Sequence, residues 1–328
     1  MKSTIFFTLA IAALVNAAPF NRNGTTLRRR DLPARSGPVY SVYADVGTTA
    51  ETWPSAENLG DWNDFLMSFW VSDGSEPRDV AAVWASMDPT LRQTILDQYH
   101  AAGKTLRVAV FGQFDLPLQR SPPGDPVEIA SAIVDFVKQF NLDGVDVDYE
   151  DTDSFSGAKA GTGEDFVIQL TKSLRELLPS GQFLISHAPQ SPYFIPNSSI
   201  FTEGAYLKIN EEVGDSIDFY NIQFYNQGIG AYETCEEHFT AAPSNFPGTT
   251  VNDLIDSGIP QEKIILGKPG LVSNPADATV DDAINGFVDP VTLGQCITSQ
   301  STKPGGVMAF QFRNANAAWI AEAKGDLP

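Results

Sequence analysis

The chain has 328 residues, of which 42% are hydrophobic, and this is enough apolar material for one large core. Its formal net charge is −20 and its pI is about 4.4, so its surface repels phosphate backbones. Nucleic acid is therefore excluded as an expected partner, and a neutral ligand suits the charge better.

The first residues have the pattern of a secretory signal. Lys2 precedes an apolar run from Thr4 to Val15, and the small residues Ala17 and Ala18 follow. The run is too short to cross a membrane as a helix. We expect a signal peptide over residues 1–17 and a secreted, extracellular protein that does not associate with membranes.

A polar stretch follows and ends in three arginines, Arg28-Arg29-Arg30, which resemble a basic processing site. This pattern predicts a propeptide over residues 18–30 and a single mature domain over residues 31–328. An arm that stays attached to the mature protein is the alternative.

Two further features fit an extracellular protein. Cys235 and Cys296 are the two cysteines of the chain, and an isolated pair in an oxidising compartment predicts a disulfide. Asn23 and Asn197 each begin an Asn-x-Ser/Thr sequon, so both are predicted glycosylation sites.

Eight short runs rich in β-branched and aromatic residues recur along the chain, and each is a predicted strand. They cover residues 39–43, 65–70, 106–111, 142–149, 183–186, 219–225, 264–266 and 306–310. Segments with helical periodicity lie between them, at residues 81–101 (interrupted by Pro89), 127–137 and 166–178. Strands and helices that alternate in this way predict an α/β protein, and eight repeats favour a single-domain (β/α)8 TIM barrel over an open sheet.

The fourth predicted strand carries an unusual set of acids. Asp146, Asp148 and Glu150 alternate along it with Val145 and Val147. Because side chains alternate between the two faces of a strand, the valines are expected to face the helices and the acids the barrel interior. Glu150 is then nearest the carboxyl end of the strand, where active sites of such barrels are built.

Three carboxylates inside a barrel raise one another's pKa values, and a carboxyl with a raised pKa can act as a general acid. The acids therefore predict a catalytic device. A calcium site and an exposed charge run are the alternatives, but the glycine and second glutamate of a calcium loop are absent and valines alternate with the acids. We expect no metal and no cofactor.

The segment Asp143–Glu150 matches the pattern D-G-x-D-x-D-x-E at every specified position and resembles glycoside hydrolase family 18. This family contains chitinases and endo-β-N-acetylglucosaminidases. Three other segments resemble the family at the fifth, sixth and eighth strands, namely Ala188–Gln190, Gln223–Asn226 and Gly305–Met308. The likeness makes residues 31–328 the expected catalytic domain.

The resemblance implies substrate-assisted catalysis, in which the acetamide oxygen of the substrate is the nucleophile. Glu150 would protonate the glycosidic oxygen and later activate water. Asp148 would orient the acetamide and balance its positive charge, Asp146 would share a proton with Asp148, and Tyr225 would hold the acetamide carbonyl.

The resemblance also assigns substrate binding to Gln223, Asn226 and Phe310, the last where many members have a tryptophan. It implies cleavage of the β-1,4 bond between two N-acetylglucosamines by a monomeric enzyme. The favoured substrate is the chitobiose core of N-linked glycans, which makes the protein an endo-β-N-acetylglucosaminidase. A chitinase acting on chitin or its oligomers is the alternative, and an inactive sugar-binding barrel is a third interpretation.

Overall fold

The computed structural model describes most of the predicted mature region, namely residues 32, 37–75, 77–271 and 285–328. The predicted signal peptide (1–17), the predicted propeptide (18–30) and the sequon at Asn23 lie outside the described residues.

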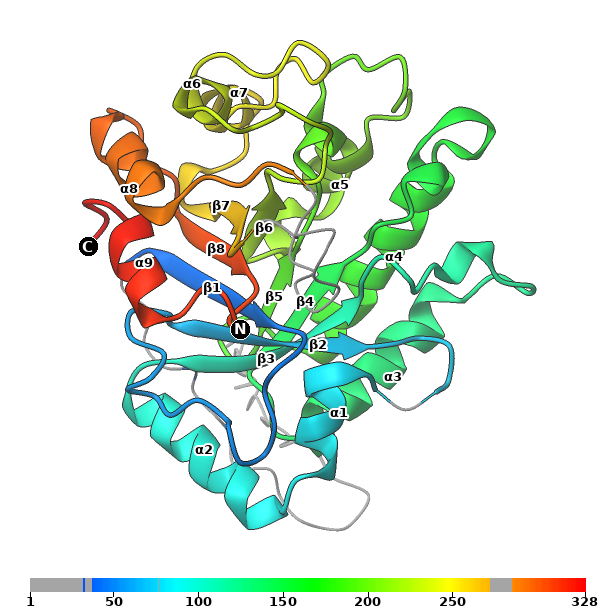
Figure 1. Cartoon of the computed structure of the whole chain (residues 1–328). Helices are drawn as coiled ribbons and strands as arrows, with labels where there is room; N and C mark the ends of the chain where they lie inside the picture. The colour runs from blue at the N-terminus through cyan, green and yellow to red at the C-terminus, as the bar shows by residue number, and fades with distance from the viewer. Residues whose placement is uncertain (1–31, 33–36, 76, 272–284) are drawn as a thin grey trace, which may run out of the picture. The chain divides into compact units, whose positions relative to one another are not determined.

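Eight parallel strands close into a barrel in chain order, and β8 pairs with β1 (Figure 1). The strands are β1 (Val39–Ala44), β2 (Asp64–Trp70), β3 (Thr105–Phe111), β4 (Gly144–Asp148), β5 (Leu184–His187), β6 (Phe219–Gln223), β7 (Ile264–Pro269) and β8 (Gly306–Phe310). Each predicted strand overlaps an observed one, and the predicted TIM barrel is confirmed.

Helices surround the strands on the outside of the barrel (Figure 1). They are α1 (Asp79–Ser86), α2 (Pro89–Ala101), α3 (Pro126–Gln139), α4 (Thr162–Leu177), α5 (Ala205–Val213), α6 (Cys235–Phe239), α7 (Val251–Asp256), α8 (Pro290–Ser299) and α9 (Ala317–Ala323). Short 3₁₀ helices lie in the loops at η1 (Pro117–Gln119), η2 (Thr152–Phe155), η3 (Gly157–Lys159), η4 (Ser191–Phe194), η5 (Gly214–Ser216) and η6 (Gln261–Lys263).

The helical segment predicted at 81–101 is two helices, because Pro89 starts a new one. Proline lacks the N–H that would continue α1, yet it fits the first position of α2. The Asp88 side chain caps α2 by accepting from the N–H groups of Thr90 at 2.8 Å and Leu91 at 3.2 Å.

The apolar side chains of the strands form two clusters, one between the sheet and the helices and one inside the barrel. Val145 and Val147 belong to the large cluster that packs the sheet against the helices. Leu66 and Met308 belong to a smaller cluster, which the alternation of the strands places inside the barrel. The valines of β4 thus face the helices as predicted, and the acids between them face inward.

The inner face also holds a buried ion pair. The Arg107 guanidinium on β3 donates to both carboxylate oxygens of Asp64 on β2, at 2.8 and 2.5 Å, and neither side chain is exposed. A third donation, of 2.7 Å, goes to the Ser186 hydroxyl on β5. Because Ser186 in turn donates to Asp146, the ion pair connects directly to the acids of β4.

A disulfide joins Cys235, at the start of α6, to Cys296 in α8, with their Cα atoms 5.5 Å apart. The predicted bridge is therefore present, and it connects positions separated by 61 residues. It fixes α6, the helix that follows the β6 loop, to the outer layer of the barrel.

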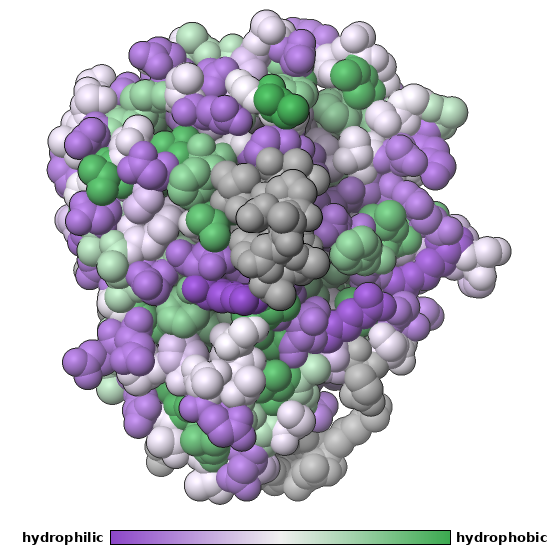
Figure 2. Space-filling model, in the orientation of Figure 1, coloured by the Kyte–Doolittle hydropathy of each residue, from purple (hydrophilic) through white to green (hydrophobic). Residues whose placement is uncertain are grey.

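The visible surface is largely hydrophilic. Outside the grey atoms, Figure 2 shows hydrophobic side chains as separate patches among polar ones on this face. None of the helices in the described part of the chain has the length and apolar character needed to cross a bilayer. The side chain of Asn197, the second predicted glycosylation site, is exposed.

We predict that replacing both cysteines, Cys235→Ala with Cys296→Ala, lowers the free energy of unfolding by about 4 kcal/mol, because the unfolded chain regains the freedom of a long loop. Denaturant unfolding measures the loss. In parallel, alkylation of the native protein without reductant, followed by intact-mass measurement, should label no thiol. Two labelled thiols would contradict the bridge.

Candidate active site

The geometry of β4 begins with Gly144. Its φ is 150°, and a Cβ atom added at this position would lie 1.9 Å from the Leu184 carbonyl oxygen on β5, so no side chain fits there. The glycine therefore lets β4 and β5 approach closely. From this start the strand directs Asp146 and Asp148 into the barrel, and Glu150 follows just beyond its carboxyl end.

Asp146 is the deepest of the three acids and is fully buried. It accepts from the Tyr43 hydroxyl at 2.6 Å, from the Ser186 hydroxyl at 2.5 Å and from the Asn221 side-chain amide at 3.1 Å. These donors come from β1, β5 and β6. These donors favour the charged form of Asp146 and oppose the effect of burial, which raises its pKa.

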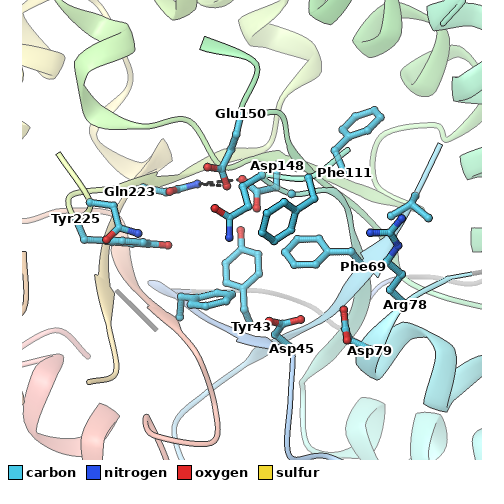
Figure 3. Close-up of a pocket in the computed structure, with 16 residues that line it drawn as sticks. Tyr43, Asp45, Phe69, Arg78, Asp79, Phe111, Asp148, Glu150, Gln223 and Tyr225 are labelled. Carbon is cyan, nitrogen blue, oxygen red and sulfur yellow. Dashed lines mark hydrogen bonds between the residues drawn. The ribbon is translucent and has the colours of Figure 1, made fainter. Parts of the chain in front are cut away.

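Asp148 and Glu150 form a hydrogen-bonded pair, and Gln223 on β6 bridges them (Figure 3). The Gln223 amide donates to Asp148 at 3.0 Å and to Glu150 at 3.5 Å. Gln190 donates to the second oxygen of Glu150 at 3.3 Å. The proton that the family resemblance assigns jointly to Asp146 and Asp148 remains a prediction.

Burial raises the pKa of all three carboxyls. For Asp148 the effect of burial is increased by repulsion from Glu150 and Asp146, which raises its pKa well above the ordinary value. Burial raises the pKa of Glu150, although hydrogen bonds with Asp148, Gln223 and Gln190 oppose the rise. Burial also raises the pKa of Asp146, against the attraction of Arg107. The pair thus retains a proton under conditions in which isolated carboxyls would be ionised, as a general acid requires.

A pocket opens above these acids. Figure 3 shows Tyr225 entering it from the side opposite Phe69 and Arg78, with Asp148 and Glu150 between. Its walls are formed by Tyr43, Asp45, Phe69, Val71, Arg78, Asp79, Phe111, Gly112, Gln113, Phe114, Asp148, Glu150, Gln223, Tyr225, Asn226 and Phe310. Every predicted catalytic or substrate-binding residue except the deeper Asp146 therefore lines one pocket.

Several contributors to the site were not predicted as site residues. Tyr43, Ser186 and Asn221 hold Asp146, and Gln190 contacts Glu150. Tyr43, Ser186 and Asn221 lie in predicted strands, and this position was their only indication in the sequence, whereas Gln190 ends the Ala188–Gln190 segment that resembles the family. Phe114, whose side chain is 81% exposed, stands at the pocket on the loop after β3.

The described residues contain no group of three or more His, Cys, Asp or Glu side chains arranged to hold a metal ion. The oxygens of Asp146 are instead occupied by hydroxyl and amide donors from the protein.

A match to a protein family agrees with this geometry. The sequence model of "Glycosyl hydrolases family 18" matches residues 123–325, which is more than half of the chain. The chain belongs to this family of glycoside hydrolases. The resemblance found in the sequence is thereby confirmed, and the acids of β4 lie within the matched region.

The curated proteins that are similar to this chain share about a quarter of its residues over the matched region. Endochitinase 37 of Trichoderma harzianum is 26% identical over 228 residues, which cover 66% of this chain and 66% of that protein, just under two thirds of its length. Endochitinase 4 of Metarhizium anisopliae is 25% identical over 245 residues, which cover 71% of this chain and 85% of that protein. A crystal structure of a GH18 chitinase from Pseudoalteromonas aurantia has a TM-score of 0.68 and 27% identity, over 87% of this chain and 99% of that one.

We predict that Asp148→Asn makes the protein more stable at neutral pH, because the raised pKa of Asp148 makes its ionisation unfavourable in the folded state. The folded-state pKa of Asp148 is raised, so its stabilising contribution is complete below the unfolded pKa and is lost as pH rises through the folded pKa. Asparagine does not titrate. The melting temperature of the variant should therefore exceed that of the wild type at about pH 7, and the difference should shrink towards about pH 3.

The matched control for this measurement is Asp135→Asn, which changes an exposed acid on α3 and should leave the melting curve unchanged. A wild type that is more stable than Asp148→Asn at neutral pH would contradict the raised pKa of Asp148.

Proposed function

We propose that this protein is a chitinase that hydrolyses the β-1,4 bonds between N-acetylglucosamine units of chitin or its oligomers. The observation that carries the proposal is the hydrogen-bonded pair of Asp148 and Glu150, which faces Tyr225 across the pocket of a family 18 barrel. The names of the relatives, endochitinase or chitinase, support the choice of substrate.

The carboxyl pair supports a substrate nucleophile rather than a protein one. A retaining glycosidase with a carboxylate nucleophile holds its two carboxyls about 5 Å apart, on either side of the scissile bond. Asp148 and Glu150 instead contact one another, and so they approach the sugar from the same side. The nucleophile is therefore assigned to the acetamide oxygen of the bound sugar.

In the first step Glu150 gives its proton to the glycosidic oxygen, and the bond between that oxygen and C1 breaks. The acetamide oxygen bonds to C1 at the same time, and the result is a cyclic oxazolinium ion. In the second step water gives a proton to Glu150 and adds to C1, which opens the ring with the original configuration. The raised pKa of Glu150 keeps the proton available for the first step.

The neighbouring groups stabilise the cyclic ion. Asp148 moves its hydrogen bond from Glu150 to the acetamide N–H and balances the developing positive charge. Asp146, with three donors from the protein, stays in place below it as a second negative charge. The Tyr225 hydroxyl holds the acetamide in line for attack on C1, and Gln223 and Asn226 bind the sugar.

This proposal changes the substrate preferred from the sequence. The chitobiose core of N-linked glycans contains the same bond, but the relatives named above have the names of chitinases and not of enzymes that act on N-linked glycans. Phe310 lies in the pocket, with its ring centroid 6.1 Å from that of Tyr43, and offers an apolar face to a sugar. Such a face suits either substrate, so chitin is favoured by the relatives and not by this contact.

We also propose that the protein is exported and processed before residue 31. The pattern of residues 1–17 and the basic triplet at 28–30 support this proposal. The disulfide between Cys235 and Cys296 is in keeping with it, because such bonds persist in oxidising compartments.

The substrate test offers the enzyme chitin oligomers and a high-mannose glycoprotein in parallel, with mass spectrometry of both. We expect shortened oligomers and an unchanged glycoprotein. Glu150→Gln should reduce turnover by a factor of about 10²–10⁴ without lowering the melting temperature, because the amide has no proton to transfer but keeps the shape of the side chain. Release of the glycan with intact oligomers would restore the N-glycan assignment, and near-normal turnover of a folded Glu150→Gln would reject the acid.

The mechanism has a separate test. A thiazoline analogue of chitobiose imitates the cyclic ion and should inhibit competitively, more tightly than chitobiose itself. An uncyclised analogue that lacks the acetamide carbonyl serves as the control and should bind weakly. A covalent sugar adduct on Asp148, trapped with a fluorosugar and located by mass spectrometry, would show that a protein carboxylate is the nucleophile.

A further inference from the structure

A buried lysine closes the base of the loop that carries Tyr225. Lys268 lies on β7 and is not exposed to solvent. Its ammonium group donates to the carbonyl oxygens of Phe224 and Tyr232, at 2.7 Å each. Phe224 and Tyr232 flank residues 225–231, so a single side chain holds both ends of this loop.

The third partner of Lys268 is the Nε2 atom of His238, at 3.0 Å. The other ring nitrogen, Nδ1, lies 2.6 Å from the Thr234 carbonyl oxygen, to which it can only donate. Nε2 is therefore the unprotonated nitrogen and accepts from Lys268. Within the described residues, all the hydrogen bonds of Lys268 thus go to neutral acceptors.

Burying a lysine ammonium group without a bonded carboxylate destabilises its charged form, and this lowers the pKa of the group. Burial lowers the pKa of Lys268 well below its ordinary value, although attraction from Glu233 and Glu237 opposes this. Burial and the nearby ammonium lower the pKa of His238 as well. A methionine would fill similar space at lower cost, so stability alone does not account for an ammonium at this point.

The backbone of Tyr225 is also enclosed from the opposite side. A Cβ atom added at Gly286 would lie 2.6 Å from the Cα of Tyr225, and the Asn226 N–H donates to the Asn285 carbonyl at 3.2 Å. Within the loop, the left-handed φ of Asn226, 64°, reverses the chain directly after Tyr225. The residues on both sides of Tyr225 are therefore held by hydrogen bonds, Phe224 through Lys268 and Asn226 through Asn285.

We propose that Lys268 is a positioning residue, which holds the ends of the 225–231 loop so that the Tyr225 hydroxyl meets the acetamide of the substrate. This inference rests on the proposed function, in which Tyr225 contacts that group. Lys268 itself lies behind the sheet, on the outward-facing side of β7 with Leu266, and does not line the pocket.

The chain provides a matched control. Lys263 stands just before β7, at the opposite end of that strand, and its ammonium group also donates to two carbonyl oxygens, those of Gly214 and Ile217, at 2.7 Å each. The bonding is similar, but neither Gly214 nor Ile217 belongs to the 225–231 loop or lines the pocket. Lys263→Met should therefore lower the melting temperature and leave kcat unchanged.

The test is a double-mutant cycle with chitin oligomers. Tyr225→Phe and Lys268→Met should each lower kcat about tenfold with little change in KM, because both affect one hydrogen bond made during the reaction. The combined variant should be no slower than Tyr225→Phe alone, since Lys268 acts through the hydroxyl that is already absent. If Lys268→Met does not fold, Lys268→Gln, which keeps one amide donor, takes its place in the cycle.

A second measurement does not depend on activity. Hydrogen exchange of the amides of residues 225–231 should become faster in the Lys268 variant and stay unchanged in Lys263→Met. A folded Lys268 variant with normal kcat, losses that multiply in the combined variant, or unchanged exchange in this loop would each overturn the proposal. Failure of the wild type to cleave chitin oligomers would reject the proposed function. Hydrogen exchange would still show whether Lys268 holds the ends of the 225–231 loop.

Discussion

Three hydrogen bonds to the buried carboxylate of Asp146 connect strands from different parts of the barrel wall. The donors, Tyr43, Ser186 and Asn221, come from β1, β5 and β6, and they point inward because side chains alternate along each strand. Without them a carboxylate at this depth would cost several kcal/mol. These donors, together with the nearby charge of Arg107, offset part of the cost of placing Asp146 below the other two acids.

The carboxylate of Asp146 affects the pair of acids above it. Repulsion from below, together with burial, favours retention of a proton between Asp148 and Glu150, and Gln223 keeps the two carboxyls in contact. The same environment that disfavours the charged carboxylates keeps a carboxyl protonated at pH values where an isolated carboxyl would be ionised. The cost of burying the two carboxyls and the rise in their pKa values have the same cause, because water does not solvate the charged forms there.

The remaining part of the site stands on a loop and needs separate support. Tyr225 lies just beyond the end of β6, in the loop that leads to α6. Lys268 holds the two ends of this loop, and the disulfide of Cys235 fixes the helix that follows it. Active-site loops on barrels are commonly mobile, and these contacts reduce the freedom of this one without occupying the pocket.

The sequence by itself determined the barrel and the placement of the acids of β4, because both are recorded in local patterns. Eight strand-like runs predicted the closed sheet, and the alternation of Asp146, Asp148 and Glu150 with valines showed which face the acids occupy. Only the tertiary structure decided that Gln223 bridges the acid pair and that Lys268 reaches across to the loop of Tyr225. These contacts join residues on different strands and loops, and no periodicity along the chain encodes them, since they arise only when the barrel closes.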